Sequence, residues 1–165
     1  MRFHRRPLAA SPFRSLFAQP VTDPPEERPS QVTGVNLHGS LQLRHVDVGS
    51  CNGCEVEITS ALGPSYDAGQ FGARLVASPR HADGLLVTGV VTHNMEGPLR
   101  QTLAALPRPA VVVACGDCAV NGGIFRGAQG VSAILSEVLT PDVVIPGCPP
   151  HPSEIVRALR TLSGR

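Results

Sequence analysis

Short apolar runs alternate with more polar stretches along the chain from residue 41 onward. The apolar runs predict strands at residues 41–48, 74–77, 84–88, 110–114 and 143–145. The stretches between and after them predict helices at residues 54–63, 97–105, 129–139 and 153–162. Strands that alternate with helices are typical of βαβ units with right-handed crossovers. The pattern therefore predicts a flavodoxin-like α/β fold, in which a parallel sheet forms the middle of a three-layer αβα arrangement.

Residues 1–40 have a different character. Arginines at positions 2, 5, 6 and 14 alternate with apolar residues, and a proline- and charge-rich stretch follows at residues 20–29. We expect residues 1–40 to form an extended arm that docks on a partner or a membrane surface, or else a disordered tail. The paired Arg5 and Arg6 are not followed by a continuous apolar segment, so we expect no export signal. Residues 41–165 then form the single folded domain.

The net charge and the aromatic content of the chain argue against a nucleic-acid partner. The net charge is +1, and all 14 basic residues are arginine. A charge so close to zero argues against general nucleic-acid binding. Aromatic residues make up only 4% of the chain, which argues against a base-stacking surface. We therefore expect no nucleic-acid partner, and no apolar run is long enough to predict a transmembrane helix.

The five cysteines all stand just after predicted strands. Cys51 and Cys54 follow the first strand, Cys115 and Cys118 the fourth, and Cys148 the fifth. Loops that follow parallel strands meet at the carboxyl edge of the sheet, so these thiols should converge. An odd number of cysteines in a chain large enough to bury a core favours metal ligation over disulfides.

From the residues alone, three kinds of site remain open. The C-x-x-C at residues 51–54 occurs in zinc sites, in redox dithiols and in iron-sulfur sites. A structural zinc site normally pairs two such motifs, and a dithiol needs no further cysteines. An iron-sulfur cluster explains more of the pattern, because glycines gather around the cysteines and prolines follow Cys148. These glycines are Gly49, Gly53, Gly116, Gly122, Gly123 and Gly147.

Four motifs carry a family resemblance. They are C-N-G-C-E-V-E at residues 51–57, A-S-P-R-H-A-D at 77–83, G-D-C-A at 116–119 with two glycines at 122–123, and P-G-C-P-P at 146–150. With these motifs, residues 41–162 resemble the small electron-transfer subunit of membrane-bound nickel-iron hydrogenases, including the formate hydrogenlyase type. They also resemble the 20 kDa cluster subunit of respiratory complex I. The resemblance implies one 4Fe-4S cluster, held by Cys51, Cys54, Cys118 and Cys148.

The spacing of the first two cysteines separates the two branches of this family. Complex I subunits carry adjacent cysteines there, whereas this chain has C-x-x-C and is more similar to hydrogenase subunits. We also expect the chain to lack the extra cluster domain of periplasmic hydrogenase small subunits, and therefore to hold a single cluster.

The resemblance implies a relay role rather than catalysis by this chain alone. Electrons would pass between a catalytic large subunit, of nickel-iron or complex I 49 kDa-like type, and ferredoxin-like cluster subunits. Membrane subunits would hold the assembly at the cytoplasmic side of the inner membrane. The alternative is the cluster subunit of a complex-I-like NADH or ferredoxin:quinone oxidoreductase without hydrogenase activity.

Several further residues have expected roles. Gly53, Gly116 and Gly147 should lie around the cluster. By resemblance, Arg80 should lie beside it and raise its potential, although a surface arginine paired with Asp83 is the simpler interpretation.

Glu57 matches an acidic residue that faces the catalytic subunit in hydrogenases, which implies a proton path; stabilisation of the helix start is the alternative. Cys115 is expected to be a small buried apolar residue. We expect no histidine ligand. Val90, Val91, Met95 and Ile124 are expected at the interface with the large subunit.

Overall fold

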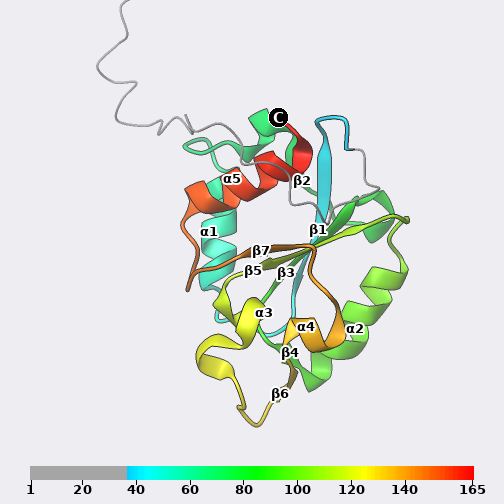
Figure 1. The fold of residues 1–165 in the computed structure, drawn as a ribbon, viewed down its shortest axis with the longest axis vertical. Coiled ribbons are helices and arrows are strands. Elements are labelled where there is room, and N and C mark those ends of the chain that lie inside the picture. Colours follow the sequence, from blue (N-terminus) through cyan, green and yellow to red (C-terminus); the bar gives the residue numbers. More distant parts are fainter. Residues whose placement is uncertain (1–36) are drawn as a thin grey trace, which may run out of the picture.

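A computed structural model describes residues 37–165. Its main sheet has five parallel strands in the order β2-β1-β3-β5-β7 (Figure 1). This is the flavodoxin-like strand order, so the predicted fold class is confirmed. The strands are β1 (Leu41–Asp47), β2 (Ala73–Leu75), β3 (Gly84–Thr88), β5 (Val111–Cys115) and β7 (Val143–Ile145).

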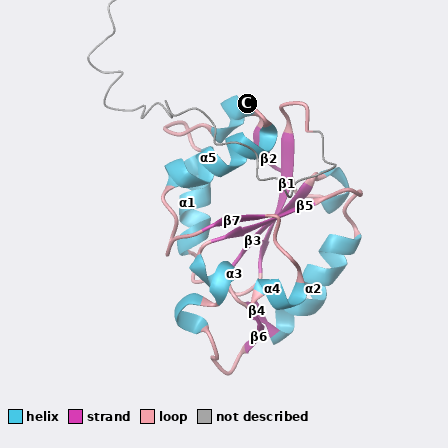
Figure 2. Ribbon diagram, in the orientation of Figure 1, coloured by secondary structure: helices cyan, strands magenta, loops and turns pink. Residues whose placement is uncertain are grey.

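Helices cover both faces of the sheet (Figure 2). Helices α1 (Gly53–Leu62) and α5 (Pro152–Ser163) pack together on one face. Helices α2 (His93–Ala104), α3 (Asp117–Asn121) and α4 (Leu135–Val138) contribute to the apolar core on the other face. Because both faces are covered, every residue of β3 and β5 is buried. That is why these strands read as continuous apolar runs in the sequence.

The region predicted as a helix at residues 129–139 is different in the structure. Residues Val131–Ala133 form β6, which pairs antiparallel with β4 (Val91–Thr92), and only the one-turn helix α4 follows. The prediction was wrong because the partner strand β4 lies about forty residues earlier in the chain and is too short to stand out as a strand in the sequence. Helix α2 begins at His93 rather than Gly97, since the structure accommodates Pro98 inside the helix.

Shorter elements also escaped prediction. They are the 3-10 turns η1 (Ala68–Phe71), η2 (Pro79–His81) and η3 (Gly123–Phe125), together with α3. Helix α3 matters most, because it carries Cys118, for which the sequence indicates a plain glycine loop.

The folded domain begins slightly before residue 41. Leu37 is buried in the core, and the Gly39 N–H donates to the Ser163 carbonyl at 3.2 Å. Residues 37–40 therefore pack on the domain, although the sequence pattern places them in the arm. The remainder of that arm, residues 1–36, lies outside the described residues. Within residues 37–165, none of the helices has the length and apolar character that crossing a membrane requires.

Candidate functional site

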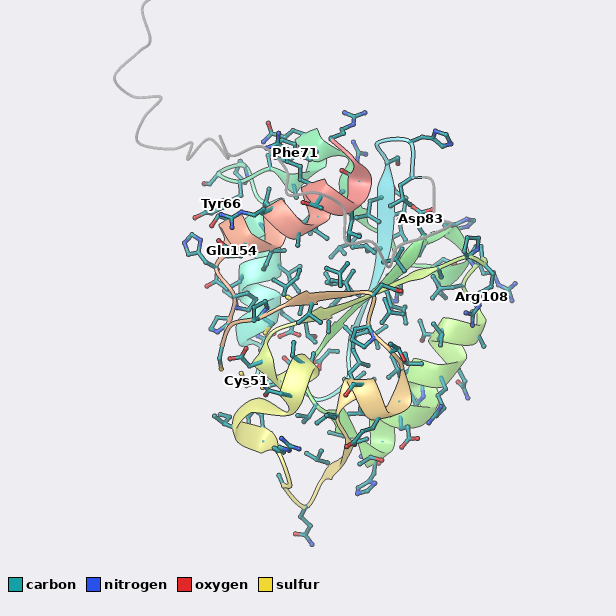
Figure 3. All side chains as sticks on the ribbon, in the orientation of Figure 1. Cys51, Tyr66, Phe71, Asp83, Arg108 and Glu154 are labelled. Atoms are coloured by element: carbon teal, nitrogen blue, oxygen red, sulfur yellow. The ribbon has the colours of Figure 1, made fainter. Side chains whose placement is uncertain are left out.

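Four of the five cysteines line a single pocket at the carboxyl edge of the sheet. They are Cys51, Cys54, Cys118 and Cys148. Cys51 lies just before α1 and Cys54 in its first turn, while Cys118 is the second residue of α3 and Cys148 follows β7. In Figure 3 the label of Cys51 marks this end of the sheet. The loops after β1, β5 and β7 thus bring together the four residues that the family resemblance implied as ligands.

Two glycines leave room for the cysteine sulfurs. Gly116 has φ +89°, and a Cβ there would overlap Cys54 Sγ. Gly123 has φ +47°, and a Cβ there would lie 3.0 Å from Cys118 Sγ. Gly53 is less restricted, since its Cβ would meet Cys51 Sγ at an ordinary 3.6 Å. The pocket is therefore a cradle that side chains at two of these positions would fill.

The electrostatic environment of the pocket disfavours the simultaneous ionisation of all four cysteines in the absence of a cation. Burial raises the pKa of Cys118, and the nearby Cys148, Cys54 and Cys51 raise it further. Four neighbouring thiolates repel one another unless cations offset their charge. The donor set therefore suits a metal centre with thiolate ligands, either zinc or an iron-sulfur cluster, which would supply positive charge. Among residues 37–165, no group of three or more His, Cys, Asp or Glu side chains could itself hold a metal ion as placed, so the four cysteines line the pocket without forming a closed ligand set.

Cys115 does not line the pocket, but it contacts a residue that does. Cys115 is fully buried at the end of β5. Its hydrogen bond to Cys54 lowers the pKa of Cys54 and raises the pKa of Cys115. Cys115 therefore acts as the protonated donor to the Cys54 sulfur. The sequence indicates only a buried apolar residue and does not predict this bond, because no spacing pattern reveals it.

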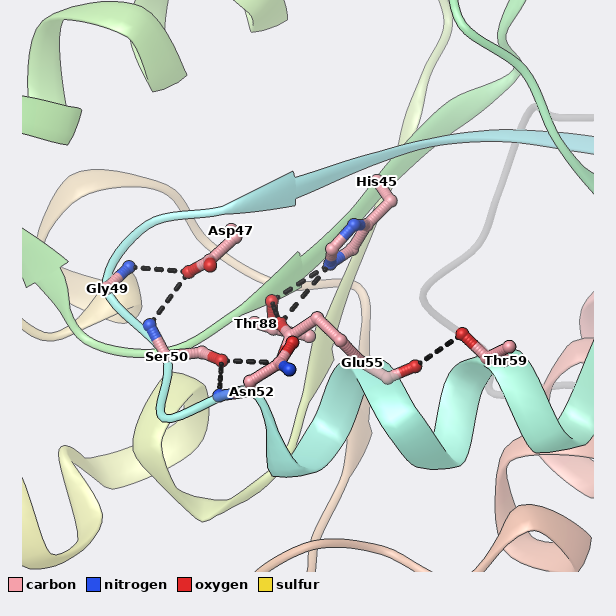
Figure 4. Close-up of polar contacts among 8 residues, drawn as sticks. All are labelled: His45, Asp47, Gly49, Ser50, Asn52, Glu55, Thr59 and Thr88. Carbon is pink, nitrogen blue, oxygen red and sulfur yellow. Dashed lines mark hydrogen bonds and ion pairs between the residues drawn. The ribbon is translucent and has the colours of Figure 1, made fainter.

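A polar network fastens the first cysteine loop to the sheet (Figure 4). The Glu55 carboxylate accepts hydrogen bonds from Ser50 Oγ at 2.5 Å and from Thr88 Oγ1. His45 Nε2 lies 2.9 Å from Thr88 Oγ1 and 3.6 Å from Glu55 Oε1. Asp47 Oδ1 accepts from the Ser50 N–H at 2.7 Å. Burial lowers the pKa of His45. Because Thr88 donates its only hydroxyl hydrogen to Glu55, Thr88 Oγ1 accepts from the Nε2–H of His45.

The sequence did not point to this network. His45 and Thr88 are 43 residues apart, and they meet because β1 and β3 pair in parallel. From the sequence, Glu55 is only an acidic residue in the first turn of a predicted helix.

Arg80 is not gathered with the cysteines. It is exposed in η2, in the connection from β2 to β3. At the end of that connection Asp83 N donates to the Gln42 carbonyl, and Gln42 N donates to Asp83 Oδ2, both at 2.7 Å. Gln42 is near the start of β1, so the connection reaches the amino-terminal edge of the sheet. The role of Arg80 beside a cluster stays a prediction without support from this geometry.

The expected interface residues differ in exposure. Val90 and Val91 are buried within this chain, with exposed fractions of 2% and 0%, so placing them at an interface was wrong. Val91 packs inward because β4 pairs with β6 over the core on that face. Met95 is partly buried against the same core. Ile124 is 79% exposed in η3, six residues after Cys118.

Glu57 is partly exposed on α1, and its proton-path role stays a prediction.

Residues 51–162 match the family described as NADH ubiquinone oxidoreductase, 20 Kd subunit, and the chain therefore belongs to that family. The matched segment spans all four pocket cysteines. Members of this family are subunits of oxidoreductase complexes.

Three relatives represent the branches of the family. The chain is 45% identical to a probable membrane-bound hydrogenase subunit, mbhJ, of Pyrococcus furiosus, over 70% of this chain and 69% of that protein. It is 44% identical to formate hydrogenlyase subunit 7 of Escherichia coli, over 69% of this chain and 45% of that protein. It is 38% identical to an NADH-quinone oxidoreductase subunit of Clostridium beijerinckii, over 66% of this chain and 65% of that protein.

A solved structure agrees with the fold. A chain of the membrane-bound sulfane sulfur reductase (MBS), an archaeal respiratory membrane complex, is 31% identical, with a TM-score of 0.66. The match covers 77% of this chain and 70% of that one. The recognised family and the fold therefore agree with the resemblance seen in the sequence motifs.

Proposed function

We propose that this chain carries a single 4Fe-4S cluster on Cys51, Cys54, Cys118 and Cys148 and serves as an electron relay in an oxidoreductase complex. The observation that carries the proposal is the convergence of four cysteines from three loops on one pocket at the carboxyl edge of the sheet. When bound, such a cluster accepts and releases one electron.

The residues of the chain would hold and shield the bound group. Gly116 and Gly123 let the sulfurs of Cys54 and Cys118 sit close to the backbone. Cys115 donates to the sulfur of Cys54, and such hydrogen bonds raise the potential of a cluster. The Glu55 network holds Ser50, and with it the loop that carries Cys51. Each residue thus acts on one ligand or on the segment that carries it.

The complex we propose is a membrane-bound hydrogenase. Support comes from the 45% and 44% identical relatives named for hydrogenase and formate hydrogenlyase, and from the C-x-x-C spacing. The partners are then a nickel-iron large subunit, a ferredoxin-like cluster subunit and membrane subunits. The chain would be peripheral, on the cytoplasmic side of the inner membrane. In this setting Glu57 would face the large subunit and pass protons.

A second candidate keeps the same cluster but not the hydrogenase reaction. The family description and the 38% identical relative named for NADH-quinone oxidoreductase favour a complex-I-like quinone reductase, with a large subunit of the 49 kDa type. The two candidates differ in the partner, because a nickel-iron site requires its own cysteine ligands in the large subunit.

The test is anaerobic purification of the intact complex through a tag on this chain. We expect the low-temperature EPR spectrum of the reduced complex to contain a 4Fe-4S component, beside the signals of the other cluster subunit, that is lost when Cys148 is replaced by serine. Zinc in place of iron at this site, or dithiol exchange activity without iron, would overturn the proposal. Hydrogen uptake or evolution by the same complex separates the hydrogenase from the quinone reductase.

A further inference from the structure

Asp117 joins the two segments that carry Cys118 and Cys148. The Asp117 N–H donates to the Gly147 carbonyl at 2.8 Å, and the Gly147 N–H donates to Asp117 Oδ1 at 2.7 Å. Asp117 directly precedes Cys118, and Gly147 directly precedes Cys148. Each partner of this reciprocal pair is therefore one residue away from a proposed ligand.

The two hydrogen bonds between Asp117 and Gly147 extend the pairing of β5 with β7 beyond the ends of these strands. Cys115 lies opposite Ile145 in the parallel pairing of β5 and β7, and the Gly116 N–H donates to the Ile145 carbonyl at 2.8 Å. Asp117 and Gly147 come two positions later on each chain segment. Hydrogen bonds from backbone N–H groups to a carboxylate are stronger than those to neutral acceptors. The carboxylate thus holds the two segments together where regular pairing has ended.

Gly147 lies close against the backbone of Pro150, where a side chain would not fit. Its φ is +133°, and a Cβ there would lie 2.6 Å from Pro150 Cα. The carboxylate of Asp117 bonds to this loop rather than to the N–H groups of its own short helix. A helix-capping role therefore does not account for it.

Asp117 also brings a carboxylate to the wall of the pocket. Asp117 itself lines the pocket with the four cysteines. A reduced cluster carries one more negative charge than an oxidised one, so a fixed carboxylate nearby opposes reduction.

We infer that Asp117 is a positioning residue that sets the spacing of Cys118 and Cys148, and that its charge lowers the reduction potential of the group they hold. The inference rests on the proposed function, since it requires a redox cluster on these cysteines. The electron comes from an added reductant, dithionite in the test below, and no bond to Asp117 forms or breaks.

The chain contains a matched control for this residue. Asp142 makes the same reciprocal pair between the same two strands, with Asp142 N donating to the Val112 carbonyl at 2.8 Å and Val112 N donating to Asp142 Oδ2 at 2.7 Å. That pair lies at the amino-terminal edge of the sheet, away from the cysteines. A purely structural role would make the two aspartates equivalent.

The experiment compares four variants in the purified complex: Asp117→Asn, Asp117→Ala, Asp142→Asn and Asp142→Ala. Asparagine keeps an acceptor oxygen for the backbone N–H but removes the charge. We expect Asp117→Asn to retain the cluster signal with a raised midpoint potential, and Asp117→Ala to lose or broaden the signal. Both Asp142 variants should keep the wild-type signal and potential.

Three results would decide against the inference. They are an unchanged potential and signal in Asp117→Asn, an unchanged signal in Asp117→Ala, or equal shifts in the Asp142 variants. If Asp117→Asn also loses the cluster while Asp142→Asn keeps it, the positioning role is supported. A wild-type complex whose signal does not depend on Cys148 would overturn the proposed function itself, which is a distinct outcome.

Discussion

The sulfur of Cys54 lies against Gly116, at the place where any side chain on residue 116 would begin. The two residues come from different segments, the start of α1 and the end of β5. Gly116 also has a positive φ of +89°, which favours glycine. Both the space and the backbone at residue 116 therefore depend on the absence of a side chain.

Gly116→Ala should lower the amount of cluster bound to this chain several-fold, because the new methyl group displaces the Cys54 sulfur. The EPR component that depends on Cys148 measures the loss per complex. Gly97→Ala is the control, since a Cβ at Gly97 meets nothing within 4 Å in α2. A Gly116→Ala complex with full cluster content would refute the proposed position of Cys54.

The ligand set is tested by serine substitution. Replacing Cys51, Cys54, Cys118 or Cys148 with serine should abolish or degrade the cluster, whereas Cys115→Ser should leave it intact. Cys115→Ala removes the hydrogen bond to the Cys54 sulfur, so it should retain the cluster and lower its potential in a redox titration. Loss of the cluster in Cys115→Ser would show that the ligand assignment is wrong.

Thr88→Val tests the polar network behind the first cysteine loop. The variant removes a fully buried hydroxyl that donates to Glu55 and accepts from His45. We expect the free energy of unfolding to fall by about 1–3 kcal/mol, because polar groups of both partners lose a hydrogen bond. Urea unfolding of the full chain measures this. Thr59→Val, on the exposed side of α1, should change stability by about 0.5 kcal/mol or less.

The pH dependence of stability should report on His45. Burial lowers the pKa of His45 in the folded chain below its ordinary 6.5. As the pH falls through 6.5, the unfolded chain binds a proton that folded His45 does not, so stability decreases until the lower folded pKa is reached. Above pH 6.5 the effect is absent. His45→Gln, whose amide can donate to Thr88, should unfold with a weaker acid dependence in thermal scans between about pH 5 and 7. Identical slopes for both proteins would contradict this assignment.

Ile124 tests the proposed partner surface. It is 79% exposed beside α3, and an aspartate there would carry a charge into a buried contact. Ile124→Asp should reduce recovery of the large subunit with the tagged chain while leaving the folded content unchanged. Leu75→Asp, on the edge strand β2 at the other side of the sheet, is the control. Equal recovery in both variants would mean that Ile124 is ordinary surface.

Much of the fold could be predicted from the amino-acid sequence. Residues of β3 and β5 are apolar at nearly every position because helices cover both faces, and this signal is local. Four of the cysteines follow strands within a few residues, and parallel strands share one carboxyl edge, so the convergence of these four on one pocket followed from order along the chain. The family, too, could be recognised from motifs that are each only a few residues long.

Tertiary structure alone decided which residues support the site. The pairing of β4 with β6 buries Val91, and the register of β1 on β3 brings His45 to Thr88. The reciprocal bonds of Asp117 with Gly147 span 30 residues. Such contacts depend on strand register and on the path of the loops. Both are set by interactions throughout the packed domain. No local pattern of apolar and polar positions encodes them, because the same residues would form different contacts in a different register.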